Sequence, residues 1–176
     1  MNYSMFKKSE FFEFFNLTEK GSAELDSGLR EVHLKTGGFQ EHIDLFIYLN
    51  KKEEIKKGRL FLDREWIGDI NSINPFGTDI SKSFIDILFP NSLLPDFKKH
   101  LIHYLFNLRG NNQVYIPLHK AFQEFEDAAP ETIPFLDVYR GEKKKSTKST
   151  ESLILSMENI LSEDKARLLI EINLKN

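Results

Sequence analysis

The sequence predicts an α+β fold in which helices pack on one face of an antiparallel sheet. Residues 29–35 and 42–49 alternate between apolar and polar side chains, which is typical of strands with one buried face. Between them, Gly37–Gly38 suits a tight hairpin turn, because glycine adopts positive φ without strain. Residues 59–67 resemble a third strand. We therefore expect an antiparallel meander of three or more strands over about residues 29–67.

Two helices are expected to follow the meander and to pack on its apolar face. The apolar residues of segment 80–89 recur at helical spacing. Segment 95–109 has the most regular helical pattern, with Pro95 suited to a first turn and Gly110 placed where a C-terminal glycine belongs. The Phe-rich segment 5–16 fits a helix or a strand equally well.

The rest of the chain suggests a division into three parts. Residues 1–140 are expected to form the α+β core domain, with a short edge strand at 113–118 and a further helix at 119–129. Segment 141–150 has four lysines and no apolar residue, so it predicts a flexible loop or linker. Residues 151–176 are expected to form a C-terminal helical pair that packs on the core.

The composition bounds the class of protein. A chain of 176 residues that is 40% hydrophobic buries enough surface to fold without disulfides or a structural metal. The absence of cysteine excludes thiolate zinc sites and cysteine nucleophiles. No apolar run has the length of a signal peptide or of a membrane span, so we expect a cytoplasmic protein. A net charge of −3 makes nucleic acid an unexpected partner.

The hairpin carries the sharpest functional hypothesis. If Gly37–Gly38 forms the turn, His33 faces His42 and Glu31 faces Asp44 on the polar face of the sheet. Directly opposed side chains lie about 5 Å apart at Cβ. Two imidazoles and two carboxylates would therefore gather on one patch.

These four residues are candidate binding residues, together with Tyr48 on the same face and Trp66, the only tryptophan. Two histidines and a carboxylate can form a metal site with open positions, so the candidate ligands are His33, His42 and Asp44. They can equally act as a general acid and base. The alternative is an ordinary solvated hairpin face, which is polar for structural reasons. The expected cofactor is accordingly none, or one divalent metal ion.

Several further acids surround the tryptophan and could hold Mg²⁺. Their spacing matches no metal-binding loop, and turns, helix caps and ion pairs explain them better. These acids are Asp63, Glu65, Asp69 and Asp79.

No motif names a reaction, since the chain has no P-loop, dinucleotide-binding glycine pattern or serine elbow. We therefore expect a small protein-interaction domain of the regulatory, adaptor or immunity/inhibitor type, without catalytic activity. Its 16 phenylalanines favour contact with another protein or with a second copy, and no membrane partner is expected. Two alternatives remain: a metal-dependent hydrolase or nuclease that uses the hairpin face, and a small-molecule sensor with a pocket between sheet and helices.

Overall fold

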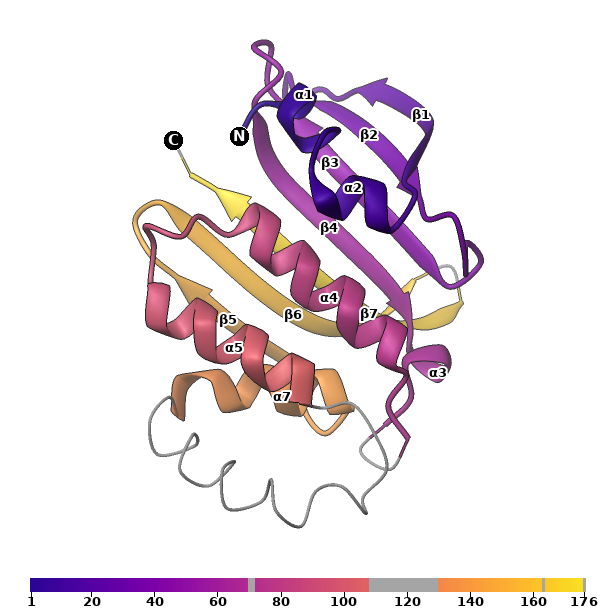
Figure 1. Ribbon diagram of the computed structural model, residues 1–176, viewed down its shortest axis with the longest axis vertical. Helices are drawn as coiled ribbons and strands as arrows, with labels where there is room; N and C mark the ends of the chain where they lie inside the picture. The colour runs from indigo at the N-terminus through magenta and orange to yellow at the C-terminus, as the bar shows by residue number, and fades with distance from the viewer. Residues whose placement is uncertain (70–71, 108–129, 163, 176) are drawn as a thin grey trace.

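A seven-stranded antiparallel sheet forms the centre of the protein, and helices lie along one of its faces (Figure 1). The computed structural model describes residues 1–69, 72–107, 130–162 and 164–175. The prediction of an α+β class with an antiparallel sheet is confirmed. The expected strand at 113–118 and the expected helix at 119–129 lie outside the described residues.

The first four strands form the meander, each pairing with the next along the chain. They are β1 (Thr18–Glu24), β2 (Arg30–Lys35), β3 (Ile43–Leu49) and β4 (Ile55–Asp63). The meander is thus confirmed, with an additional strand before it. Residues 59–67 are not one strand, because β4 begins earlier and the short helix α3 (Arg64–Ile67) occupies the last four positions.

The last three strands correct the predicted helical pair at 151–176. They are β5 (Lys145–Ser149), β6 (Leu153–Ser162) and β7 (Lys165–Leu174), so the segment expected to be a linker holds an edge strand. In β7 the buried residues Leu168, Ile170 and Ile172 recur at every second position, which is the period of a strand. The pairing of β7 with its neighbouring strands outweighs the helix propensity of residues such as Ala, Leu and Glu.

β7 joins the two halves of the sheet. It pairs with β4 on one side and with β6 on the other, so the strand order is β1-β2-β3-β4-β7-β6-β5. The final residues of the chain therefore contribute to the same sheet as the first four strands.

Besides α3, the described helices are α1 (Tyr3–Phe6), α2 (Glu10–Phe14), α4 (Pro75–Leu88), α5 (Pro95–Asn107), the 3₁₀ turn η1 (Pro130–Thr132) and α7 (Ile133–Arg140). Three of them, α1, α2 and α4, begin after a residue whose side chain caps the first turn. The helix expected at 80–89 starts earlier, because the Asn74 side chain accepts a hydrogen bond from the Phe76 amide and Pro75 suits the first turn. No helix among the described residues is long and apolar enough to cross a membrane.

The hydrophobic core lies between the helices and one face of the sheet. A helix packs very closely on β4 at Gly58, because a Cβ at this position would overlap the Leu88 side chain and lie 3.0 Å from the Phe84 ring. Both side chains belong to α4, so this helix packs directly on β4. The opposite face of the sheet, which we call the open face, carries the residues that alternate with the core residues.

Candidate functional site

The hairpin pairs in a different register from the predicted one. His33 of β2 lies opposite Phe46 of β3, and the prediction that it faces His42 is therefore wrong. The pairing is displaced by four residues. Because four is even, each residue stays on the face that the sequence predicted for it. The polar face of the hairpin is thus the open face of the sheet.

The displacement arises in the connection between β2 and β3. Gly37 and Gly38 are not the residues of a two-residue turn, and neither adopts positive φ. Instead, residues 36–42 form a longer connection in which Phe39 has φ of 58°. A backbone hydrogen bond from the His42 amide to the Phe39 carbonyl closes this connection.

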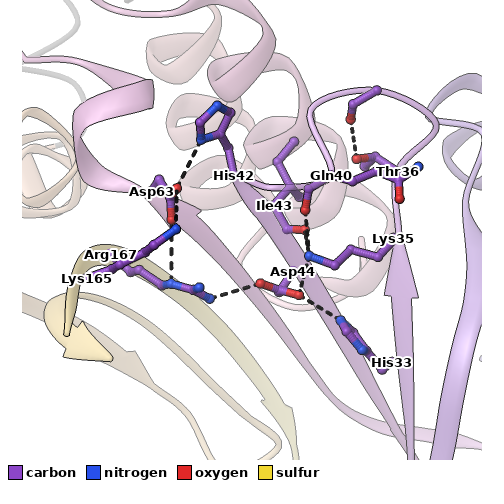
Figure 2. Close-up of polar contacts among 11 residues, drawn as sticks. His33, Lys35, Thr36, Gln40, His42, Ile43, Asp44, Asp63, Lys165 and Arg167 are labelled. Atoms are coloured by element: carbon purple, nitrogen blue, oxygen red, sulfur yellow. Dashed lines mark hydrogen bonds and ion pairs between the residues drawn. The ribbon is translucent and has the colours of Figure 1, made fainter. Parts of the chain in front are cut away.

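Asp44 binds three side chains on the open face (Figure 2). His33 Nε2 and Lys35 Nζ lie 2.7 and 2.6 Å from its Oδ1, and Arg167 Nη1 lies 2.9 Å from its Oδ2. Burial alone would raise the pKa of Asp44, but the hydrogen bonds and positive charge of Lys35 and His33 outweigh it and lower the pKa below its ordinary value. Asp44 therefore stays ionised.

Asp63 organises the other end of the same network. His42 Nδ1 lies 3.0 Å from its Oδ2, and Arg167 Nε lies 3.6 Å from its Oδ1. Lys165 Nζ lies further away, at 3.9 Å. Figure 2 shows Arg167 between the two carboxylates, with the histidines at the two ends. We call this set the Asp44–Asp63 network; it comprises His33, Lys35, His42, Asp44, Asp63, Lys165 and Arg167.

Aromatic rings hold both imidazoles in place. The His33 ring stacks on Phe46, with centroids 4.5 Å apart and planes 9° from parallel. The His42 ring stacks on Trp66, with a centroid distance of 5.4 Å and an angle of 11°. Each ring thus has one face covered by an aromatic ring and a nitrogen beside a largely buried carboxylate, and about a third of each histidine side chain is exposed. The other nitrogen of His42, Nε2, lies 3.5 Å from the exposed Glu41 carboxylate.

Glu31 and Tyr48 lie in a second set of contacts. Tyr48 accepts a hydrogen bond from Arg59 Nη1 at 3.2 Å, and burial, with a hydrogen bond to Glu31, raises the pKa of Tyr48 to about 12. Glu171 accepts from Arg59 Nε at 2.6 Å and lies 3.0 Å from Lys57 Nζ. We call this set the Tyr48–Glu171 network; it comprises Glu31, Tyr48, Lys57, Arg59 and Glu171.

An apolar belt separates the two networks. Phe61 of β4 lies opposite Leu169 of β7, and the Phe46 and Phe61 rings meet edge to face with centroids 5.7 Å apart. All three side chains are partly exposed and lie outside the hydrophobic core. The belt, defined as Phe46, Phe61 and Leu169, thus crosses three strands of the open face.

The predicted site residues are only partly brought together. The structure places His33 beside Asp44, but it pairs His42 with Asp63 and gives Trp66 to His42 as a stacking partner. Three members of the network do not follow from the predicted elements. Lys165 and Arg167 fall in the segment expected to be helical, and Asp63 belongs to the acids for which turns, caps and ion pairs are the preferred explanation. The alternation of residues 170–174 between apolar and polar positions is the signal that, continued back along the strand, places Arg167 on the open face.

The geometry does not fit a metal ion bound by His33, His42 and Asp44. The two histidines contact different carboxylates, and Lys35 and Arg167 already occupy Asp44. Within the described part of the chain, no group of three or more His, Asp or Glu side chains is placed to hold a metal ion. The chemistry that the arrangement does offer is a pair of oriented imidazoles within a charge-balanced surface.

The depressed pKa of Asp44 predicts a loss of stability in acid. A carboxylate whose folded pKa lies below its unfolded value of about 3.9 stabilises the fold above that value and loses this contribution as the pH falls through the folded pKa. We expect urea unfolding to show a falling free energy below about pH 4. Asp44→Asn should lower stability at pH 7 and flatten this dependence, whereas the exposed Asp26→Asn should change neither. An unchanged acid slope in Asp44→Asn would contradict the assignment.

Fold and site together define a class: an α+β protein with a seven-stranded antiparallel sheet and an open face that carries two charge networks around an apolar belt. No protein-family model, curated protein or solved structure matches the chain. Its function therefore has to be argued from the residues of the site.

Proposed function

We propose that the protein is a regulatory or adaptor protein that binds another protein through the open face of the sheet. The observation that carries the proposal is the apolar belt between two charge networks. Protein–protein interfaces have this anatomy, with an aromatic-rich centre and a surrounding polar rim. Binding energy concentrates in such central aromatic residues, while the rim excludes water. Phe46 and Phe61 would be the anchors.

The charges of the open face support a protein partner of balanced charge. The two networks contain five fixed cations (Lys35, Lys57, Arg59, Lys165 and Arg167) and four carboxylates (Glu31, Asp44, Asp63 and Glu171). Most of these groups already have partners within the chain, so a docking partner need not supply a compensating charge for each of them. This balance does not favour the inhibitor of a strongly basic enzyme.

The two alternatives from the sequence receive less support. A metal-dependent hydrolase or nuclease would need its ligands around one point, and His33 and His42 contact different carboxylates. Three grooves cut into the described surface, but neither histidine lines any of these three. These grooves are also open to solvent, whereas the site of a small-molecule sensor buries most of its ligand.

The test is a charge placed in the centre of the belt. In affinity purification from native extract, Phe61→Lys should capture about tenfold less of the specific partner than wild type. The reason is that losing a central anchor weakens the binding free energy by more than about 1.4 kcal/mol. Leu161→Lys is the matched control, since Leu161 is an exposed apolar residue outside the belt. The partner is quantified by mass spectrometry, and circular dichroism checks that each variant folds.

Two outcomes would contradict the proposal. One is a capture pattern that is the same for wild type, Phe61→Lys and Leu161→Lys. The other is that wild type captures no protein and also sediments as a monomer at about 100 μM, well above the dissociation constants of specific interfaces. A dimer that Phe61→Lys dissociates would identify a second copy as the occupant of the open face.

A further inference from the structure

We propose that the helical side of the protein carries a second, independent binding site: a groove between α2 and α4 that takes an apolar peptide segment flanked by basic residues. Residues of α2 and α4 line the groove, and Figure 1 shows both helices on the side of the sheet opposite the open face. Its use would make the protein an adaptor with two surfaces. The proposal does not depend on the function assigned to the open face.

The groove has an apolar floor. Its volume is about 830 Å³, and it is open to solvent, which suits a segment of peptide chain rather than an enclosed small molecule. Phe11, Phe15 and Phe89 form the floor and are almost wholly buried. Ile87 and Pro90 extend it along the end of α4. Only apolar side chains of an occupant would replace water favourably against this surface.

Exposed apolar side chains flank the groove. Phe14 is 75% exposed, and its ring meets that of Phe15 edge to face, with centroids 5.0 Å apart. Met1 is 46% exposed and lines the same groove. Exposing a phenylalanine ring to water is unfavourable. An occupant that covers Phe14 would therefore bind more tightly, because it removes this apolar surface from water.

The charges beside the groove identify the occupant as basic. The charged groups of the residues that line it are three carboxylates (Glu10, Asp79 and Asp86) and two ammonium groups, those of Lys82 and of the Met1 N-terminus. Lys82 pairs with Asp79 at 3.1 Å. Asp86 lies 2.8 Å from the buried Lys98 but keeps 65% of its side chain exposed. Glu10 and the exposed part of Asp86 thus present negative charge to solvent, which complements Lys or Arg on an occupant.

The two ends of the groove differ in charge, which predicts the orientation of a bound peptide. It continues between α4 and α5 as a second groove of about 520 Å³, and the two grooves share Lys82, Ser83, Asp86 and Asn91. The continuation is lined by Lys98 and Lys99, so the acidic character belongs to the α2 end. The basic residues of the occupant should therefore lie beside its apolar anchor at that end.

The proposal is tested by selecting binding peptides from a random library. A display library of random 12-residue peptides is panned against the full chain, and the affinities of the most enriched peptides are measured by fluorescence polarisation. We expect enriched sequences to combine apolar anchors with an excess of Lys and Arg. Their affinities should fall tenfold or more for Glu10→Lys and for Phe14→Ser, and should be unchanged for Phe61→Lys on the open face.

Three results would overturn the proposal: no enrichment, enriched peptides without a basic excess, or peptides that bind Glu10→Lys and Phe14→Ser as well as wild type. Peptides that lose affinity only for Phe61→Lys would assign peptide binding to the open face instead. Glu10 and Phe14 are both exposed, so these variants are expected to fold, and thermal unfolding checks this. Because capture at the open face and peptide binding at the groove use different variants, either can fail without the other.

Discussion

Replacing Phe84 with alanine should lower the free energy of unfolding by about 3–5 kcal/mol. Phe84 is fully buried in α4, and its ring lies against the position where Gly58 leaves room on β4. Truncation removes the transfer free energy of the ring and leaves a cavity between helix and sheet, which rigid backbone on both sides cannot close. Urea unfolding followed by circular dichroism measures the change.

Phe14→Ala is the matched control for Phe84→Ala. It removes a phenylalanine ring from an exposed position on α2, so the free energy of unfolding should change by no more than about 0.5 kcal/mol. A loss below about 1.5 kcal/mol for Phe84→Ala, or equal losses for the two variants, would contradict the packing of α4 on β4.

Arg167→Met should destabilise the protein by about 2 kcal/mol. The guanidinium contacts Asp44 and Asp63 and lies almost out of solvent, so its removal leaves two largely buried carboxylates with fewer partners. The loss stays below the full cost of an unpaired buried charge, because Asp44 keeps Lys35 and Asp63 keeps His42. Chemical unfolding at pH 7 provides the measurement.

Two comparisons separate this loss from a general effect of removing a cation. Lys165→Met deletes a cation that is 58% exposed and 3.9 Å from Asp63, so the expected change is below about 0.5 kcal/mol. A double-mutant cycle of Arg167→Met with Asp44→Asn should give a coupling energy of about 1 kcal/mol. Additive effects would show that the two side chains do not interact in solution.

The sequence predicted the faces of the hairpin better than its pairing. Alternation along residues 29–35 and 42–49 assigns each side chain to a face with a period of two, and an even displacement preserves that assignment. The pairing itself depends on how many residues the connection uses. Gly37 and Gly38 permit a tight turn but do not require one, and the structure uses seven residues between the strands instead.

The C-terminal strands were mistaken for helices because two local signals disagree there. Residues 165–174 contain good helix formers, yet all their apolar side chains except Leu169 also fall at every second position. A short segment of this kind is decided by its neighbours, and the edge of β4 supplies the partner. The contact between Arg167 and Asp44 joins residues 123 positions apart, and no local pattern predicts a pairing of that range.

The position of β7 has a consequence for how the protein is made. The strand that completes the sheet is the last described strand to be synthesised, yet it fills the gap between β4 and β6. Until it emerges, the edge of β4 has no partner along Lys57–Asp63, and the hairpin of β5 and β6 has no neighbour to join. Pairings over such sequence separations form slowly, and an open strand edge invites association with other chains. The sheet therefore closes only when the strand that carries Arg167 reaches the two aspartates.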